Sequence, residues 1–161
     1  MLEEDVIRVV VRYLKKYSYM NKIIEKLEDD IKFMTITERD VNSYLKSKGK
    51  ISRSVEVEVM KRISIENEIK RIRKWKAVIE TVLNIYKEFD PAKYEYMQLK
   101  FFTGNSVVSI KFETTLGETT QTKYRREGAL YIAIFAAQEK LISMKKVDEI
   151  LKMKQKNDGI K

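Results

Sequence analysis

The chain has 161 residues, with no cysteine and no histidine, and its 33 lysine and arginine residues outnumber 24 aspartate and glutamate residues to give a net charge of +9. The missing residue types exclude disulfides, a serine–histidine triad, a cysteine–histidine pair and the ordinary zinc sites. The surplus of positive charge favours a polyanionic partner, of which nucleic acid is the commonest.

The rest of the composition favours an all-α, cytoplasmic protein that is not an enzyme. One proline and five well-separated glycines leave no Gly-rich phosphate loop and few breaks for strands and turns. No apolar run approaches the ~18 residues of a membrane span, so we expect no membrane partner. A carboxylate-only or magnesium-dependent site stays open, but no acidic cluster stands out, and we expect no cofactor and no metal.

The first expected element is a long helix from about Glu3 to Met34. Its apolar side chains recur alternately four and three residues apart, which places them on one face of a helix. We interpret this first seam as core. It consists of Val6, Val10, Tyr13, Tyr17, Met20, Ile24, Leu27, Ile31 and Met34.

A break is expected after this helix. Thr35 or Thr37 would cap a new helix, and Glu38 follows Thr35 at the spacing of a capping box. Residues 46–54 hold four cations and no acid. We interpret them as a mobile, solvated linker, with phosphate contact as the alternative.

A second long helix is expected from about Val55 to Phe89, with its start near Ser54. Its seam and the first one would bury each other as an antiparallel hairpin, or would pack between chains, for example in a homodimer. The pattern does not choose between these arrangements. The second seam consists of Ile65, Ile69, Ile72, Ile79, Leu83 and Tyr86.

Residues 70–76 of this second helix include five cations. These side chains would either grip backbone phosphates, or pair with acids of the first helix or face solvent, and we favour the ion pairs or the solvated face over phosphate contact. Trp75, in the same stretch, is interpreted as a packing residue. The candidate acidic partners are Glu25, Glu28, Asp29 and Asp30.

Pro91 is expected to end the second helix and to open the C-terminal part. Residues 92–102 predict a short amphipathic helix closed near Gly104. Residues 106–115 predict another short element, a helix rather than the strand that their alternating apolar residues would also fit. A third helix is expected after the turn at residues 116–117, capped by Thr119 or Thr120 and continuing through Leu141 and Met144.

A short helix, a glycine turn and a helix with polar, basic first turns form the layout of a helix-turn-helix reader of double-stranded DNA. Glutamine can bond adenine, arginine can bond guanine, a threonine methyl can touch thymine, and basic side chains attract phosphates. The alternative is an ordinary three-helix packing unit whose polar first turn faces water. The expected DNA-binding residues are Thr119, Thr120, Gln121, Thr122, Lys123, Tyr124, Arg125 and Arg126.

Three stretches of this part resemble region four of bacterial sigma factors. They are Leu99-Lys100-Phe101-Phe102-Thr103-Gly104, Leu116-Gly117 and Tyr124-Arg125-Arg126-Glu127-Gly128-Ala129-Leu130.

Over roughly residues 50–141 the chain is more closely similar to phage late-gene regulators of the RinA and ArpU type. That similarity also rests on residues 52–56, 74–80 and 83–89. It implies a transcriptional activator with an N-terminal helical region, a region-four-like reader and RNA polymerase as a partner. The spacing from Ser106 to Gly117 is longer than is usual in region four. This difference affects which residues of the expected recognition helix would contact bases.

We therefore predict a helical hairpin or coiled-coil-like platform over residues 1–90, a helix-turn-helix domain over 91–150 and a basic tail over 151–161. The predicted function is sequence-specific regulation of transcription, in a phage or prophage. The alternative is a helical assembly or adaptor protein, such as a small DNA-packaging (terminase) subunit. A third hypothesis is a structural helical protein that binds no nucleic acid.

Overall fold

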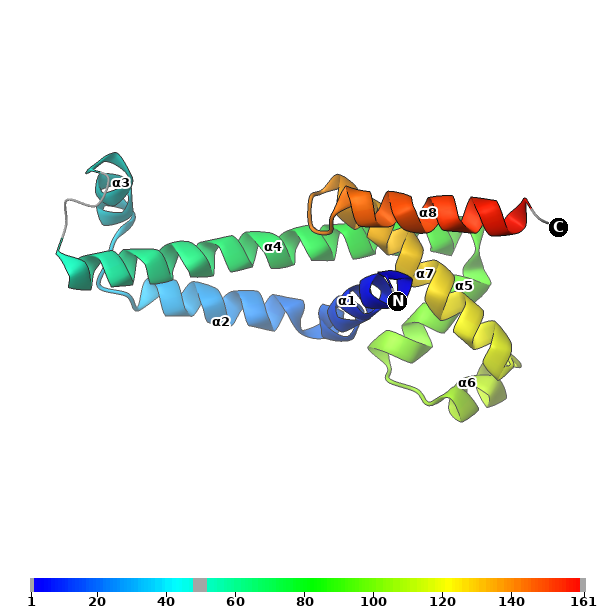
Figure 1. Cartoon of the computed structure of the whole chain (residues 1–161). Coiled ribbons are helices and arrows are strands. Elements are labelled where there is room, and N and C mark those ends of the chain that lie inside the picture. The colour runs from blue at the N-terminus through cyan, green and yellow to red at the C-terminus, as the bar shows by residue number, and fades with distance from the viewer. Residues whose placement is uncertain (1, 48–51, 160–161) are drawn as a thin grey trace. The chain divides into compact units, whose positions relative to one another are not determined.

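The computed structural model describes residues 2–47 and 52–159. Within these ranges every regular element is a helix and none is a strand, which confirms the expected all-helical class (Figure 1). None of the described helices combines the length and the apolar character that crossing a membrane requires. The chain forms two compact units: a larger one from Met1–Ser18 with Lys74–Lys161, and a smaller one from Tyr19–Arg73.

This division differs from the expected boundary near residue 90. The N-terminal helix α1 (Leu2–Lys16) packs with the C-terminal helices of the larger unit, chiefly α7 (Glu118–Gln138) and α8 (Met144–Asp158). A heptad-like seam shows which side of a helix is buried but does not identify the helix that covers it. For that reason the sequence did not reveal this grouping.

The single helix expected from Glu3 to Met34 is interrupted. The chain instead forms α1, a 3-10 turn η1 (Tyr17–Tyr19) and α2 (Met20–Lys32). Every residue of the first seam is nevertheless buried or half-buried, which confirms its interpretation as core.

The smaller unit contains α2, α3 (Glu38–Ser47) and the first part of α4 (Arg53–Phe89). The cap of α3 is Thr37, one of the two expected candidates. Its Oγ1 accepts from the backbone N of Asp40 at 3.4 Å, and Asp40 Oδ2 accepts from the backbone N of Thr37 at 2.8 Å. The capping box therefore joins Thr37 to Asp40, and not Thr35 to Glu38.

A small apolar cluster and two arginines hold the smaller unit together. Ile36, Val41 and Val59 are buried against one another. Arg62 donates to the backbone oxygen of Ile36 at 2.7 Å. Arg73 pairs with Glu28, as we expected for the basic stretch 70–76. Of the linker expected over 46–54, residues 48–51 lie outside the described residues, and Lys46 belongs to α3.

Helix α4 is 37 residues long and ends at Phe89, close to both expected limits. Asp90 then caps α5 (Pro91–Met97), whose last turn continues into a π-helical turn η2 (Gln98–Phe102). The following α6 (Val107–Thr114) confirms the helix, and not the strand, over this stretch.

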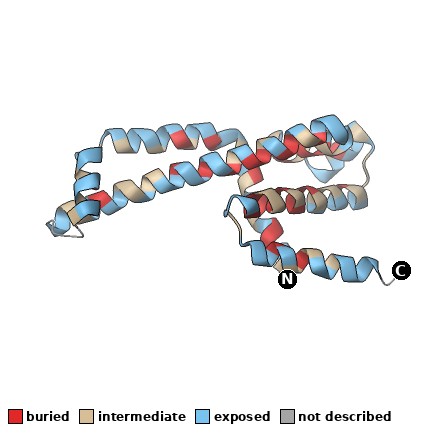
Figure 2. Ribbon diagram, turned by 90° about the horizontal axis from the view of Figure 1, so that it is seen from above, coloured by how far each residue is buried: buried red, intermediate tan, exposed pale blue. Residues whose placement is uncertain are grey.

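Small residues let other helices approach α7 closely, and α7 contacts α1, α5, α6 and α8 in the larger unit. Its fully buried positions include Ala129, Ile132, Ala133 and Ala136. Figure 2 shows buried residues in red along one side of the helices and exposed residues in pale blue along the other.

Helix α7 ends earlier than expected, at Gln138, and does not reach Met144. The chain reverses at Lys140, whose φ of 59° is left-handed, and α8 follows. Val147 and Ile150 of α8 are buried. The predicted basic tail over residues 151–161 is therefore helical as far as Asp158, and its preceding turns are anchored in the core.

Candidate nucleic-acid interface

The candidate interface is built on α6, the turn after it and the first turns of α7. Ser106 Oγ caps α6 by accepting from the backbone N of Ser109 at 3.1 Å. The helix closes at Thr115, whose φ is 63° and whose N–H donates to Lys111 O at 3.0 Å. This left-handed closure turns the chain sharply before α7 begins.

The N-cap of α7 is Gly117, and no side chain caps the helix. The expected cap by Thr119 or Thr120 is wrong, because both residues already lie inside the helix. Since the first amides of a helix have no acceptor within it, an uncapped N-terminus keeps hydrogen-bonding capacity and a partial positive charge for an outside anion.

Gln121 was expected to contact a base, but it points into the protein. Its side chain is 2% exposed, and Nε2 donates to Val107 O and to Leu116 O, each at 2.9 Å. These bonds fasten the start of α6 and the turn to α7. Gln121 is thus a residue that fixes the helix pair, and its assignment to DNA contact is wrong.

Tyr124 also faces inward. Its ring meets Tyr96 edge-on with centroids 6.0 Å apart, and Lys93 Nζ lies 5.7 Å from its centroid. Burial raises the pKa of Tyr96 to about 12, against the opposing charge of Arg125. Arg125 and Thr120 are half-buried as well. Tyr124, Thr120 and Arg125 are therefore only partly accessible, and their expected DNA contacts stay predictions.

Four of the expected residues share the exposed face of α7, at helical spacing: Thr119, Thr122, Lys123 and Arg126. Thr122 Oγ1 donates to the backbone oxygen of Glu118 at 3.0 Å, which fixes its side chain against the helix. Lys123 Nζ lies 3.8 Å from Glu127 Oε1, and the Lys123 side chain is 67% exposed. An exposed pair at this distance is weak, so Lys123 can exchange its partner for a phosphate.

Arg126 is already engaged within the larger unit. Its guanidinium pairs with the carboxylate of Glu3, which also lies 3.6 Å from Lys154 Nζ. The hydrogen bond from Arg126 lowers the pKa of Glu3, against the opposing effect of burial, and the charge of Lys154 adds to the lowering. The Glu3 carboxylate therefore already offsets part of the positive charge of these two cations.

The exposed face of α7 borders an open groove of about 480 Å³ against the end of α8. Three cations and two acids line it, so the face is of mixed charge. The lining residues are Thr119, Thr122, Lys123, Arg126, Glu127, Lys154, Asn157 and Asp158.

Sequence reasoning missed the contribution of Glu3, Lys154 and Asn157 to this face. The available signal was the spacing of Val147, Ile150, Leu151 and Lys154, which places them on one side of a helix. Among the described residues, no group of three or more acidic side chains is close enough together to hold a metal ion.

Comparison of the chain with protein-family models, with curated proteins and with solved structures found no match. The resemblance to RinA- and ArpU-type regulators therefore stays a prediction that rests on the residues alone.

Proposed function

We propose that this protein is a sequence-specific DNA-binding regulator of transcription that contacts double-stranded DNA with the exposed face of α7. We further propose that it is a cytoplasmic phage or prophage late-gene activator that works with RNA polymerase. The observation that carries the first proposal is the pair of hydrogen bonds that the Gln121 side chain donates. These bonds fix α6 and the turn against α7 while Thr119, Thr122 and Lys123 stay exposed on one face.

The geometry supports a specific division of roles on this face. The uncapped amides of α7 and the hydroxyl of Thr119 would bind a backbone phosphate and set the register. The methyl group of Thr122 would touch a thymine, and Lys123 would bond a guanine edge. Arg126 would exchange Glu3 for a second phosphate, and Lys154 would do the same from α8.

The net charge of +9 supports the same proposal, because DNA binding draws much of its affinity from neutralised phosphates. The charge is not concentrated on α7, however. We therefore assign the general attraction to the whole protein and the discrimination between sequences to Thr122 and Lys123.

The test begins with selection of bound duplexes from a random pool, followed by anisotropy titrations of the enriched duplex with three proteins: the unchanged chain, Lys123→Gln and Lys22→Gln. Lys22 is an exposed lysine of α2, so both variants lose the same charge. We expect Lys123→Gln to weaken binding about 5- to 150-fold, in line with about 1–3 kcal/mol for a base contact. Lys22→Gln should change affinity much less. A pool without enrichment, or equal losses in the two variants, would refute the proposal.

A second candidate function is a helical assembly or adaptor protein, for example a small DNA-packaging subunit. It is favoured by large apolar side chains that the smaller unit exposes: Phe33 is 80% exposed, and Leu45 and Val57 are each 61% exposed. Exposed apolar side chains support association between chains where they gather into one patch. Mass measurement in solution separates the candidates, since a ring of many subunits favours assembly and a monomer or dimer favours the regulator.

A further inference from the structure

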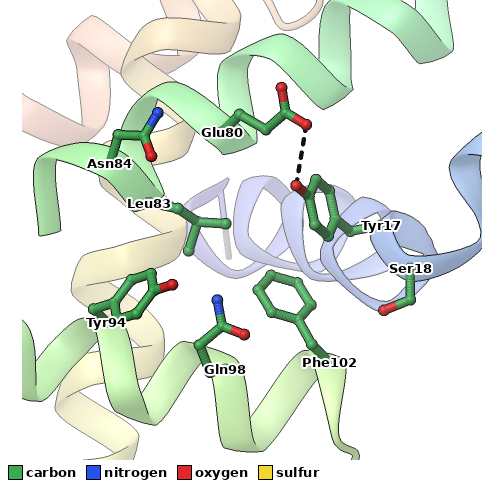
Figure 3. Close-up of a pocket in the computed structure, with 8 residues that line it drawn as sticks. All are labelled: Tyr17, Ser18, Glu80, Leu83, Asn84, Tyr94, Gln98 and Phe102. Atoms are coloured by element: carbon green, nitrogen blue, oxygen red, sulfur yellow. Dashed lines mark hydrogen bonds between the residues drawn. The ribbon is translucent and has the colours of Figure 1, made fainter. Parts of the chain in front are cut away.

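A second hollow, separate from the groove beside α7, lies within the larger unit among α4, the α5–η2 segment and Tyr17 (Figure 3). Its volume is about 410 Å³. That value falls within the range of small-ligand sites, about 300–1,000 Å³. Figure 3 shows Tyr94, Gln98 and Phe102 extending from the α5–η2 segment toward Glu80 and Leu83 of α4.

Aromatic rings form much of the wall of this pocket. Tyr17, Tyr94 and Phe102 line it, and the rings of Tyr17 and Phe102 lie with centroids 4.8 Å apart at an angle of 42°. The faces of aromatic rings carry partial negative charge and attract cations. The side-chain amides of Asn84 and Gln98 add oxygens that can accept hydrogen bonds from a ligand.

Glu80 provides the only formal charge among the residues that line the pocket. Tyr17 Oη donates to Glu80 Oε1 at 3.1 Å, and Lys76 Nζ lies 3.7 Å from the same oxygen. An ionised carboxylate has about four acceptor sites, so Glu80 has the capacity to accept further hydrogen bonds from a ligand. Burial, together with the charge of Glu80, raises the pKa of Tyr17 to about 12, so its hydroxyl stays a donor to the carboxylate at ordinary pH.

The residues that line this pocket therefore differ in charge from the chain as a whole. In a protein of net charge +9, one acid and no base line the hollow. An anionic ligand would meet the Glu80 carboxylate, whose pair with Lys76 at 3.7 Å lies outside the lining residues. A cationic N–H donor would satisfy both the carboxylate and the rings.

We propose that the pocket formed by Glu80, Tyr17, Tyr94, Gln98 and Phe102 binds a guanidinium or alkylammonium group. Glu80 accepts the charged N–H, the aromatic rings pack against the cation, and the Gln98 amide oxygen accepts a second hydrogen bond. Such a group occurs in small organic amines and in the arginine and lysine side chains of polypeptides. The site is independent of the proposed DNA contacts, so either proposal can fail without the other.

The test is a titration of the full chain followed by NMR, using the side-chain amide signals of Asn84 and Gln98. Butylguanidinium is compared with butylurea, which has nearly the same shape but no charge. We expect saturable shifts with butylguanidinium and at least about tenfold weaker binding of butylurea, since a factor of ten corresponds to about 1.4 kcal/mol. Equal binding of the two probes, or no saturable shift with butylguanidinium, would overturn the proposal.

Variants provide the second arm. Glu80→Gln keeps the size of the side chain and removes its charge, and we expect at least about tenfold weaker binding of butylguanidinium. The matched control is Glu88→Gln, an exposed position on the same helix that does not line the pocket. Retained affinity in Glu80→Gln, or equal losses in both variants, would contradict the assignment of Glu80.

A third arm distinguishes the sources of the cation. Butylammonium and a capped tripeptide with a central arginine are titrated in the same way. Tighter binding of the tripeptide than of butylguanidinium indicates a polypeptide side chain as the natural occupant. Weaker binding of the tripeptide, with retained binding of the small cations, indicates a free amine.

Discussion

The ring of Tyr13 stacks on the indole of Trp75, with centroids 4.1 Å apart and planes inclined by 11°. Trp75 has no exposed surface, whereas Tyr13 is half-buried and covers it from α1. The pair joins α1 to α4 inside the larger unit, and Trp75 is the only tryptophan of the chain. Its fluorescence therefore reports directly on this contact.

Replacing Tyr13 with alanine should lower the free energy of unfolding by about 2 kcal/mol, because the change removes half-buried apolar surface together with a ring pair that contributes about 0.5–1.5 kcal/mol. Urea unfolding followed by Trp75 emission measures the loss. The control is Tyr19→Ala, since Tyr19 is 60% exposed. That change should stay within about 0.5 kcal/mol. Equal losses in both variants would show that the stacked pair contributes little.

Replacing Glu3 with glutamine should strengthen DNA binding about 3- to 10-fold at neutral pH. The substitution releases Arg126 and Lys154 for phosphate contacts that the carboxylate otherwise opposes. Anisotropy titrations against the selected duplex measure the change. Asp5→Asn is the control, because it removes the same charge from the same helix at an exposed pair with Arg8. A gain in Asp5→Asn as large as that in Glu3→Gln would indicate a general charge effect.

The same carboxylate should make stability depend on pH in a defined direction. The pKa of Glu3 in the folded chain lies below its ordinary value of 4.5, chiefly because Arg126 donates to it. Its contribution is therefore fully present above about pH 4.5 and is lost as the pH falls through the lowered pKa. The difference in unfolding free energy between the unchanged chain and Glu3→Gln should shrink below pH 4.5. Urea titrations from pH 7 to pH 3 test this, and a constant difference would contradict it.

Gly128 marks a close approach of α7 to Met97. A methyl group at Gly128 would lie 3.2 Å from Met97 Sδ and 3.5 Å from its Cε. Gly128→Ala should change stability by less than about 1 kcal/mol, because the flexible methionine can yield and alanine gains about 1 kcal/mol of helix propensity.

A branched side chain at the same position leaves no such compensation. Gly128→Val should cost about 2 kcal/mol or more, since overpacking of a well-packed core forces neighbours out of their rotamers. Thermal and urea unfolding of the two variants give the comparison. If valine is tolerated as well as alanine, the contact with Met97 is looser than the geometry implies.

The helices of this chain were largely predictable because their signals are periodic. The first seam and the extent of α4 follow from spacing that a helix converts into one buried face. The break at η1 did not follow, because the seam keeps its rhythm through Tyr17 and Met20. No glycine or proline marks that turn.

Helix ends were harder to predict where the usual residue is missing. Glycine is the common sign of a left-handed closure, yet α6 closes at Thr115 and α7 at Lys140. At Lys140, the N–H of Leu141 donates to Ala136 O at 2.8 Å and the N–H of Lys140 donates to Ala137 O at 3.0 Å. This is the Schellman pattern without its glycine. Because no glycine marks the end of α7, the prediction extended this helix too far and missed α8.

The start of α7 was predicted from the sequence, but which of its first residues face outward was not. The first turns of α7 carry few apolar residues, so periodicity alone did not settle which side is buried. Gln121 points inward because its side chain donates hydrogen bonds to two backbone oxygens. Tyr124 points inward because its ring packs against Tyr96. These contacts are more favourable than exposure of the two side chains to water. Such partners lie on other elements and cannot be read from local spacing.

The π-helical turn at Gln98–Phe102 makes this segment one residue longer than an α-helix joining the same ends would be. The N–H of Thr103 reaches back five residues to Gln98 O at 3.0 Å, and Tyr96 meets Phe101 edge-on across the same interval. A single-residue deletion here would restore ordinary helical winding, whereas one within α7 would rotate every later side chain by about 100°. Length variation among natural variants of this chain should therefore be tolerated at η2 and selected against in α7.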